Sequence, residues 1–112
     1  LFMRLLSNSN LNLGEHLLGA ALDNKYGYFE DERVVNYHVK SIKKGSFGPL
    51  MANNKIYIKA DLKEAARIYK TLLIEKVEAI KDPRLCLFLD VWDKVSNKEA
   101  NYIFIFRNPN EV

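Results

Sequence analysis

Apolar residues recur at spacings of three and four along two stretches of the chain. The first repeat lies in residues 31–42 and consists of Val34, Val35, His38, Val39 and Ile42. The second repeat follows Asp61 and consists of Leu62, Ala65, Ala66, Tyr69, Leu72 and Leu73. Such spacing places apolar side chains on one face of a helix. We therefore predict two amphipathic helices, with His38 packed on the apolar face of the first.

Polar and conformationally restricted residues mark where these helices begin and end. Asp61 with Glu64 three residues later forms a capping box, and Gly45 is a stop signal after the first helix. The second helix either continues through 77–80 or ends before it, in which case 77–80 is a short buried strand. Pro83 interrupts the pattern and pushes the residue before it toward an extended conformation. A further helix is predicted over 84–95.

The remaining patterns predict short strands and loops. Residues 1–7 read as the end of a helix, 8–30 mostly as loop, and 55–59 as a short strand within the excursion 46–60. Residues 102–106, YIFIF, are apolar throughout, which is typical of a strand buried on both faces of a parallel sheet. Helices that alternate with short apolar strands indicate an α/β fold with a mainly parallel sheet.

Composition restricts the protein class without identifying a function. The 112 residues are 48% hydrophobic and 28% charged, as in a soluble globular chain, and no apolar run approaches the roughly 20 residues of a membrane helix. The net charge of +3 is modest and lysines are spread along the chain, so we expect no nucleic-acid partner. The single cysteine, Cys86, favours a reducing, cytoplasmic location, and we expect it to be a small buried residue.

Arg107 stands where the predicted strand meets a helix start signal. Asn108 is a good N-cap, Pro109 fits the first helical position, and Glu111 lies three residues beyond the cap. Ligands of open α/β sheets bind at the carboxyl ends of strands, and a helix N-terminus attracts anions. Arg107 is therefore either a phosphate-binding fork or a surface residue paired with a carboxylate.

Three motifs in order carry a resemblance to a known family. They are LNLGEHLLGAALDNKYGYFEDERVV (11–35), KDPRLCL (81–87) and IFIFRNPNEV (103–112). With them the chain resembles the sulfotransferases that use 3′-phosphoadenosine 5′-phosphosulfate, and most of all the bacterial branch with Gly-Tyr-Phe-Glu and Lys-Asp-Pro-Arg signatures. The resemblance covers residues 1–42 and 77–112.

The resemblance implies a P-loop-type three-layer α/β/α fold that is incomplete at both ends. Residues 1–112 would be a single partial domain, with the phosphosulfate loop before residue 1 and the remainder after residue 112. The implied cofactor is 3′-phosphoadenosine 5′-phosphosulfate, with adenosine 3′,5′-bisphosphate as product and no metal. Arg107 matches the family arginine that holds the 3′-phosphate. We expect the 112 residues alone to be inactive and poorly stable.

The resemblance also assigns the chemistry to particular residues. Lys81 matches a lysine that assists the transferring sulfuryl group, whereas Pro83 occupies the place of the family's histidine base. Glu30 is the candidate base and Asp82 the second choice. The alternative for Glu30 is that it charges or caps the helix that follows.

The acceptor side of the expected site is less specific. Tyr28 and Phe29 line an acceptor pocket or belong to the core, and Arg84 binds substrate or fixes its loop through a salt bridge. The acceptor would be a small molecule or glycan with a hydroxyl or amine. The alternative functions are another P-loop small-molecule transferase or kinase, and a non-catalytic domain that retains the fold.

Overall fold

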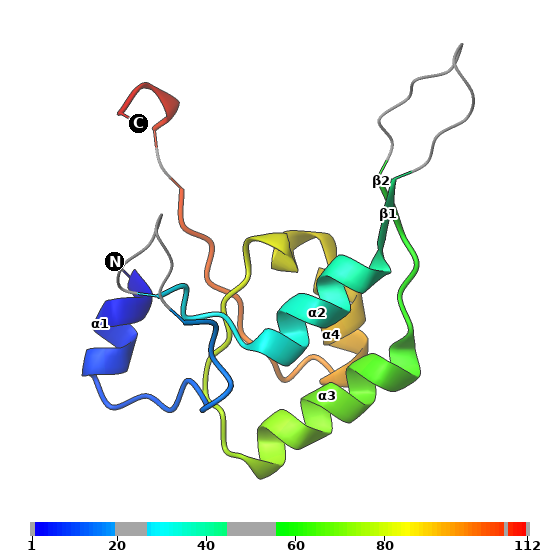
Figure 1. Ribbon diagram of the computed structural model, residues 1–112, viewed down its shortest axis with the longest axis horizontal. Helices are drawn as coiled ribbons and strands as arrows, with labels where there is room; N and C mark the ends of the chain where they lie inside the picture. The colour runs from blue at the N-terminus through cyan, green and yellow to red at the C-terminus, as the bar shows by residue number, and fades with distance from the viewer. Residues whose placement is uncertain (1, 20–26, 45–55, 107, 112) are drawn as a thin grey trace.

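The computed structural model describes residues 2–19, 27–44, 56–106 and 108–111. Its elements are shown in Figure 1 and are, in chain order, α1 (Phe2–Asn8), α2 (Glu32–Ser41), β1 (Ile42–Lys44), β2 (Ile56–Ile58), α3 (Leu62–Ile74), the 3-10 helix η1 (Pro83–Leu87), α4 (Leu89–Val95) and the 3-10 helix η2 (Pro109–Glu111).

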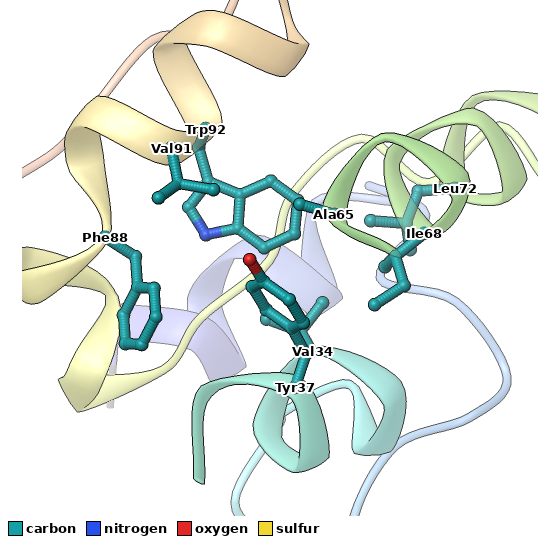
Figure 2. Close-up of a cluster of buried hydrophobic side chains, with 8 residues drawn as sticks. All are labelled: Val34, Tyr37, Ala65, Ile68, Leu72, Phe88, Val91 and Trp92. Carbon is teal, nitrogen blue, oxygen red and sulfur yellow. The ribbon is translucent and has the colours of Figure 1, made fainter. Parts of the chain in front are cut away.

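The core lies where α2, α3 and α4 pack against one another (Figure 2). Each contributes a stripe at helical spacing, and the buried apolar members are Val34, Tyr37, Ala65, Ile68, Leu72, Phe88, Val91 and Trp92. The predicted apolar face of α3 is wrong for three of its members, because Leu62, Ala66 and Leu73 are exposed. The helix is covered along one side only, so the stripe of Ala65, Ile68 and Leu72 is the part that reaches the core.

Aspartate side chains cap the starts of both helices, and the cap predicted at Asp61 is confirmed. Asp31 Oδ1 accepts hydrogen bonds from the backbone N–H of Arg33 and Val34, and Asp61 Oδ1 accepts from Lys63 and Glu64. These bonds satisfy N–H groups that have no partner within the helix. The cap of α2 also binds its own helix to α3, because the Arg33 guanidinium bridges the carboxylates of Asp31 and Glu75.

The end of α3 excludes both predictions for residues 77–80. The helix stops at Ile74, and the Asn12 side-chain amide donates hydrogen bonds to the carbonyl oxygens of Glu75 and Lys76 at 3.1 and 2.8 Å. These carbonyls would otherwise be unpaired at the helix end. The segment 77–80 then runs as irregular backbone, neither helix nor strand. The helix itself ends in a local turn, because Lys76 has a left-handed φ of +57° and the N–H of Val77 donates to the carbonyl of Leu72. Asn12 adds its bonds to this turn.

The strand predicted at 55–59 is confirmed at Ile56–Ile58. It pairs antiparallel with β1, in the register Ile42↔Ile58 and Lys44↔Ile56. This hairpin is the only sheet within the described ranges. The three-layer α/β/α arrangement and its mainly parallel sheet therefore stay predictions.

Residues 102–106 differ from the buried strand predicted for them. They form no strand pairing with the rest of the described chain, and the side chains from Ile103 to Phe106 are between 56% and 90% exposed. The expected burial is thus wrong for these residues in this chain. A continuous apolar run becomes an inner strand only when other strands flank it, and none of the described segments does so.

Two further expectations are corrected near Pro83. The helix predicted over 84–95 is divided into η1 and α4, because Pro83 starts a tight 3-10 turn that ends at Phe88. Cys86 lies on the outer side of this turn and is exposed, not buried. In the ranges described above, no helix is both long enough and apolar enough to cross a membrane.

Candidate functional site

Lys81 and Glu30 form an ion pair beside a cavity that Lys81 helps to line. Lys81 Nζ lies 2.6 Å from Glu30 Oε1, although the two residues are 51 positions apart in the chain. The Glu30 side chain is buried, whereas that of Lys81 is 37% exposed. The sequence analysis assigned both residues to catalysis, and the structure brings them into direct contact.

Local backbone pairing holds Glu30 in this place. The N–H of Leu18 donates to the Glu30 carbonyl, and the N–H of Glu32 donates to the carbonyl of His16, both at 2.8 Å. These bonds join the loop 16–18 to the start of α2. The cap of α2 is Asp31, and the Glu30 carboxylate points instead to Lys81. Capping therefore does not account for Glu30.

The cavity has a volume of about 1050 Å³ and mainly apolar walls. Its lining comes from α1, residues 27–29, the end of α3, and the segments 77–82 and 99–105. Lys81 and Asp82 belong to the lining, as do Tyr28 and Phe29, which are half-buried. Lys81 Nζ also lies 3.4 Å from the Tyr28 carbonyl oxygen. An apolar hollow with a few convergent polar groups is the usual form of a small-molecule site.

Phe29 has a backbone conformation that large side chains rarely adopt. Its φ is +55°, and the neighbouring Gly27 has a φ of +83°. Glycine adopts such angles freely, whereas a bulky residue is strained there. Strain of this kind is often found at functional sites, where it fixes a side chain in a required place. In this chain the strained residue, Phe29, lies between Tyr28, which lines the cavity, and Glu30.

Asp82 differs from Glu30 because both of its carboxylate oxygens are occupied in the core. Oδ2 lies 2.7 Å from His38 Nδ1, and Oδ1 accepts from the N–H and from Nη1 of Arg84 at 2.9 and 2.7 Å. Burial acts to raise the pKa of Asp82, but the hydrogen bonds from His38 and Arg84 outweigh it, so the pKa lies below its ordinary value. The carboxylate is therefore ionised and has no exposed surface.

Arg84 adopts the salt-bridge arrangement that the sequence analysis offered as one alternative. Its guanidinium pairs with Asp82, and its backbone N–H is capped by the same carboxylate. Both bonds join residues two positions apart, so they stabilise the first turn of η1.

His38 is the site residue whose partners the sequence analysis did not find. Its side chain is fully buried and stacks on Phe88 at a ring distance of 4.2 Å. Trp92 Nε1 lies 2.9 Å from His38 Nε2. An indole nitrogen can only donate, so Nε2 must accept and the ring proton lies on Nδ1, where it points to Asp82. The available signal was a histidine on an apolar helix face, which predicted burial but gave no partner.

Arg107 lies outside the described residues, and its assignment to the 3′-phosphate stays a prediction. The start signal that follows it does form a turn. Asn108 Oδ1 accepts a hydrogen bond from the N–H of Asn110 at 3.0 Å, and η2 begins at Pro109.

The described ranges contain no group of three or more histidine, cysteine or acidic side chains placed to hold a metal ion. No protein-family model matches the chain, and no curated protein or solved structure is significantly similar to it.

Proposed function

We propose that the chain contributes to a sulfotransferase site at the cavity beside Lys81. The observation that carries the proposal is the 2.6 Å pair between Glu30, which is buried, and Lys81, which lines a largely apolar cavity. This pair places one positive group and one acidic group side by side. Sulfuryl transfer needs both, because the acceptor loses a proton while negative charge develops on the transferring group.

The roles follow from the positions of the residues. Glu30 accepts the proton of the acceptor hydroxyl or amine, and Lys81 stabilises negative charge at the transferring group. Tyr28 and Phe29 form part of the wall against which the acceptor lies. Arg84 keeps the turn after Lys81 in place through its pair with Asp82. Asp82 is an anchor and not a base in this proposal, because both of its oxygens are engaged in the core.

The cofactor would be held only in part by these 112 residues. 3′-Phosphoadenosine 5′-phosphosulfate supplies an activated sulfuryl group when it is bound. Lys81 is a cation of the cavity wall, as is Arg4, and would interact with an anionic group there; Arg107 would bind the 3′-phosphate. The resemblance places the loop for the 5′-phosphosulfate before residue 1, so activity is expected only in a protein that also carries that loop.

Calorimetric titration with two nucleotides tests the cofactor assignment in the full-length protein. We expect adenosine 3′,5′-bisphosphate to bind, and Arg107→Ala to weaken its binding by about 2–4 kcal/mol through loss of a charge-assisted fork. Arg107→Lys should recover part of the loss, because an ammonium cannot make the same two bonds. Adenosine 5′-phosphate should bind weakly and equally to both proteins.

Three results would contradict this assignment. Failure of adenosine 3′,5′-bisphosphate to bind would leave the non-catalytic alternative. Preferential binding of ATP with Mg²⁺ would favour a kinase. Equal losses for the two nucleotides in Arg107→Ala would make Arg107 a structural residue.

Glu30→Gln tests the proposed base separately. The amide keeps the shape of the side chain and an oxygen for Lys81, but it cannot accept a proton. We expect the rate of sulfuryl transfer to the acceptor to fall by about 100-fold or more, the usual scale for a general base. Nucleotide binding should be unchanged. Unchanged transfer in Glu30→Gln would remove Glu30 from the mechanism.

A further inference from the structure

We propose that His38 is a positioning residue for Lys81, and that it acts through Asp82. His38 holds the Asp82 carboxylate in the core. The side chain of Lys81, the residue before Asp82, is thereby directed toward Glu30 and the cavity. The use of Lys81 in sulfuryl transfer rests on the proposed function. The positioning itself is a property of the fold and is measured independently.

The backbone at Asp82 transmits the effect. Asp82 is extended, with φ −153° and ψ 130°. In extended backbone, successive side chains point to opposite sides. The side chain of Asp82 is fully buried, whereas that of Lys81 is 37% exposed and reaches Glu30. Any rotation that moved Asp82 out of the core would therefore also move Lys81 away from its partner.

His38 provides the connection between Asp82 and another element. The other bonds of the Asp82 carboxylate come from Arg84, two residues away, and would move together with the same turn. The bond from His38 spans 44 residues and comes from α2, the helix that follows Glu30 directly. Helix α2 therefore sets both the position of Glu30, which lies just before it, and the direction of Lys81, which pairs with Glu30.

The imidazole itself is fixed on two further sides. Phe88 stacks on the ring at 4.2 Å, and Trp92 occupies Nε2 through its N–H. This bond keeps the ring neutral with its proton on Nδ1, so that His38 donates to Asp82. The arrangement resembles the way in which a second residue orients a metal-binding or catalytic histidine, with the roles of the partners exchanged.

Stability alone does not explain this buried network. Removing a carboxylate from water is costly, and apolar residues of similar volume often stabilise a core as well as a buried charged group does. What the network adds is a fixed direction at residues 81 and 82. A polar anchor is needed for this purpose, because apolar contacts tolerate small rotations that a hydrogen bond of 2.7 Å does not.

Competitive labelling of lysine amines in the full-length protein tests the proposal. Trace acetic anhydride at a fixed neutral pH modifies free amines, and mass spectrometry gives the relative rate at each lysine. We expect Lys81 to be protected in the wild type by its pair with Glu30. Glu30→Ala removes the partner altogether and gives the rate of the released amine, while the exposed Lys63 and Lys70 on α3 serve as internal references.

The decisive variants remove the anchor without touching Lys81. Asp82→Ala removes the carboxylate and leaves no unpaired charge in the core, and His38→Leu removes the donor. We expect each to raise labelling of Lys81 by about two- to five-fold, the factor that corresponds to a lost ion pair of ordinary strength. Labelling of Lys63 and Lys70 should stay unchanged. His38→Asn, whose amide can donate from the position of Nδ1, should restore most of the protection.

If His38→Leu unfolds, labelling rises at every lysine and this variant gives no information about Lys81. Asp82→Ala then decides the question. If Lys81 stays protected in folded Asp82→Ala while Glu30→Ala releases it, His38 and Asp82 do not position Lys81 and the proposal is overturned. Failure of the nucleotide titrations would contradict the proposed function but would leave this result unaffected.

Discussion

His38 is the residue with the most constrained surroundings in the core. Its two ring nitrogens bond to side chains from two other parts of the chain, Asp82 before η1 and Trp92 on α4. Both bonds are buried, so water cannot replace either partner when one is removed. The loss of a buried partner costs more than the net value of the bond, because the remaining group keeps its desolvation penalty.

Trp92→Phe should reveal this penalty. The change removes the N–H donor and leaves His38 Nε2 buried without a partner, so we expect the free energy of unfolding to fall by about 1–3 kcal/mol beyond the loss from packing. Urea unfolding of a double-mutant cycle with His38→Leu separates the two contributions, since Nε2 is absent in that background. Equal effects of Trp92→Phe in the two backgrounds would show that the bond contributes nothing.

The lowered pKa of Asp82 predicts sensitivity to acid. A carboxyl group with a lower pKa in the folded state stabilises the fold above its ordinary pKa of about 3.9. This stability is lost as the pH falls below that value through the folded-state pKa. We expect the free energy of unfolding to decrease over this range, and Asp82→Asn to decrease less. Parallel pH dependence of the two proteins, measured by urea unfolding, would contradict the assignment.

At the scale of elements, the starts of α2 and α3 are capped by residues of the same turn. Asp31 and Asp61 bond to N–H groups two and three residues away. The end of α3 is a local turn through Lys76, to which Asn12, more than 60 residues away, adds two hydrogen bonds. Tyr102 similarly ties the segment after α4 to that helix, because its hydroxyl donates to Asp93 at 2.8 Å. Burial together with this bond raises the pKa of Tyr102 to about 12.

Asp61→Ala should destabilise the protein through the start of α3. The cap lost here is of the ordinary kind, so we expect a decrease of about 1 kcal/mol in the free energy of unfolding. Asp61→Asn is the matched control, because its side-chain oxygen accepts the same bonds from Lys63 and Glu64. Urea unfolding of the three proteins provides the comparison. A loss in Asp61→Asn as large as that in Asp61→Ala would indicate a role for the charge in place of the cap.

At the scale of the whole molecule, the chain is less compact than its length predicts. The radius of gyration is 16.0 Å, whereas about 13 Å is typical of a compact domain of this size. Figure 1 shows the β1–β2 hairpin and the segment after α4 extending away from the three packed helices. Residues 103–106 expose four consecutive apolar side chains on that segment. Apolar surface of this kind favours association.

We therefore expect the purified 112-residue chain to self-associate and to unfold at low temperature. Replacement of Ile103 and Ile105 by Thr should reduce association without lowering the free energy of unfolding, because both side chains are largely exposed. Sedimentation velocity over a range of concentrations measures the first effect, and thermal unfolding the second. A chain that stays monomeric and unfolds cooperatively at high temperature would contradict this expectation.

The sequence by itself determined the features that depend on neighbours within a few residues. These are the positions of α2 and α3, the cap at Asp61 and the strand at 56–58. Periodicity, capping and proline geometry act over one or two helical turns, so they can be read from a single chain.

Only the tertiary structure decided which distant residues meet. The bonds of Lys81 to Glu30 and of Asp82 to His38 span 51 and 44 positions, and no local pattern encodes them. The motifs indicated Lys81, Asp82 and Glu30 as site residues. They did not indicate that Lys81 is partly exposed at the cavity while the neighbouring Asp82 is buried, because packing decides this. The prediction of a buried strand at 102–106 was wrong for the same reason. An apolar run shows that a segment can be buried, but the surrounding segments decide whether it is.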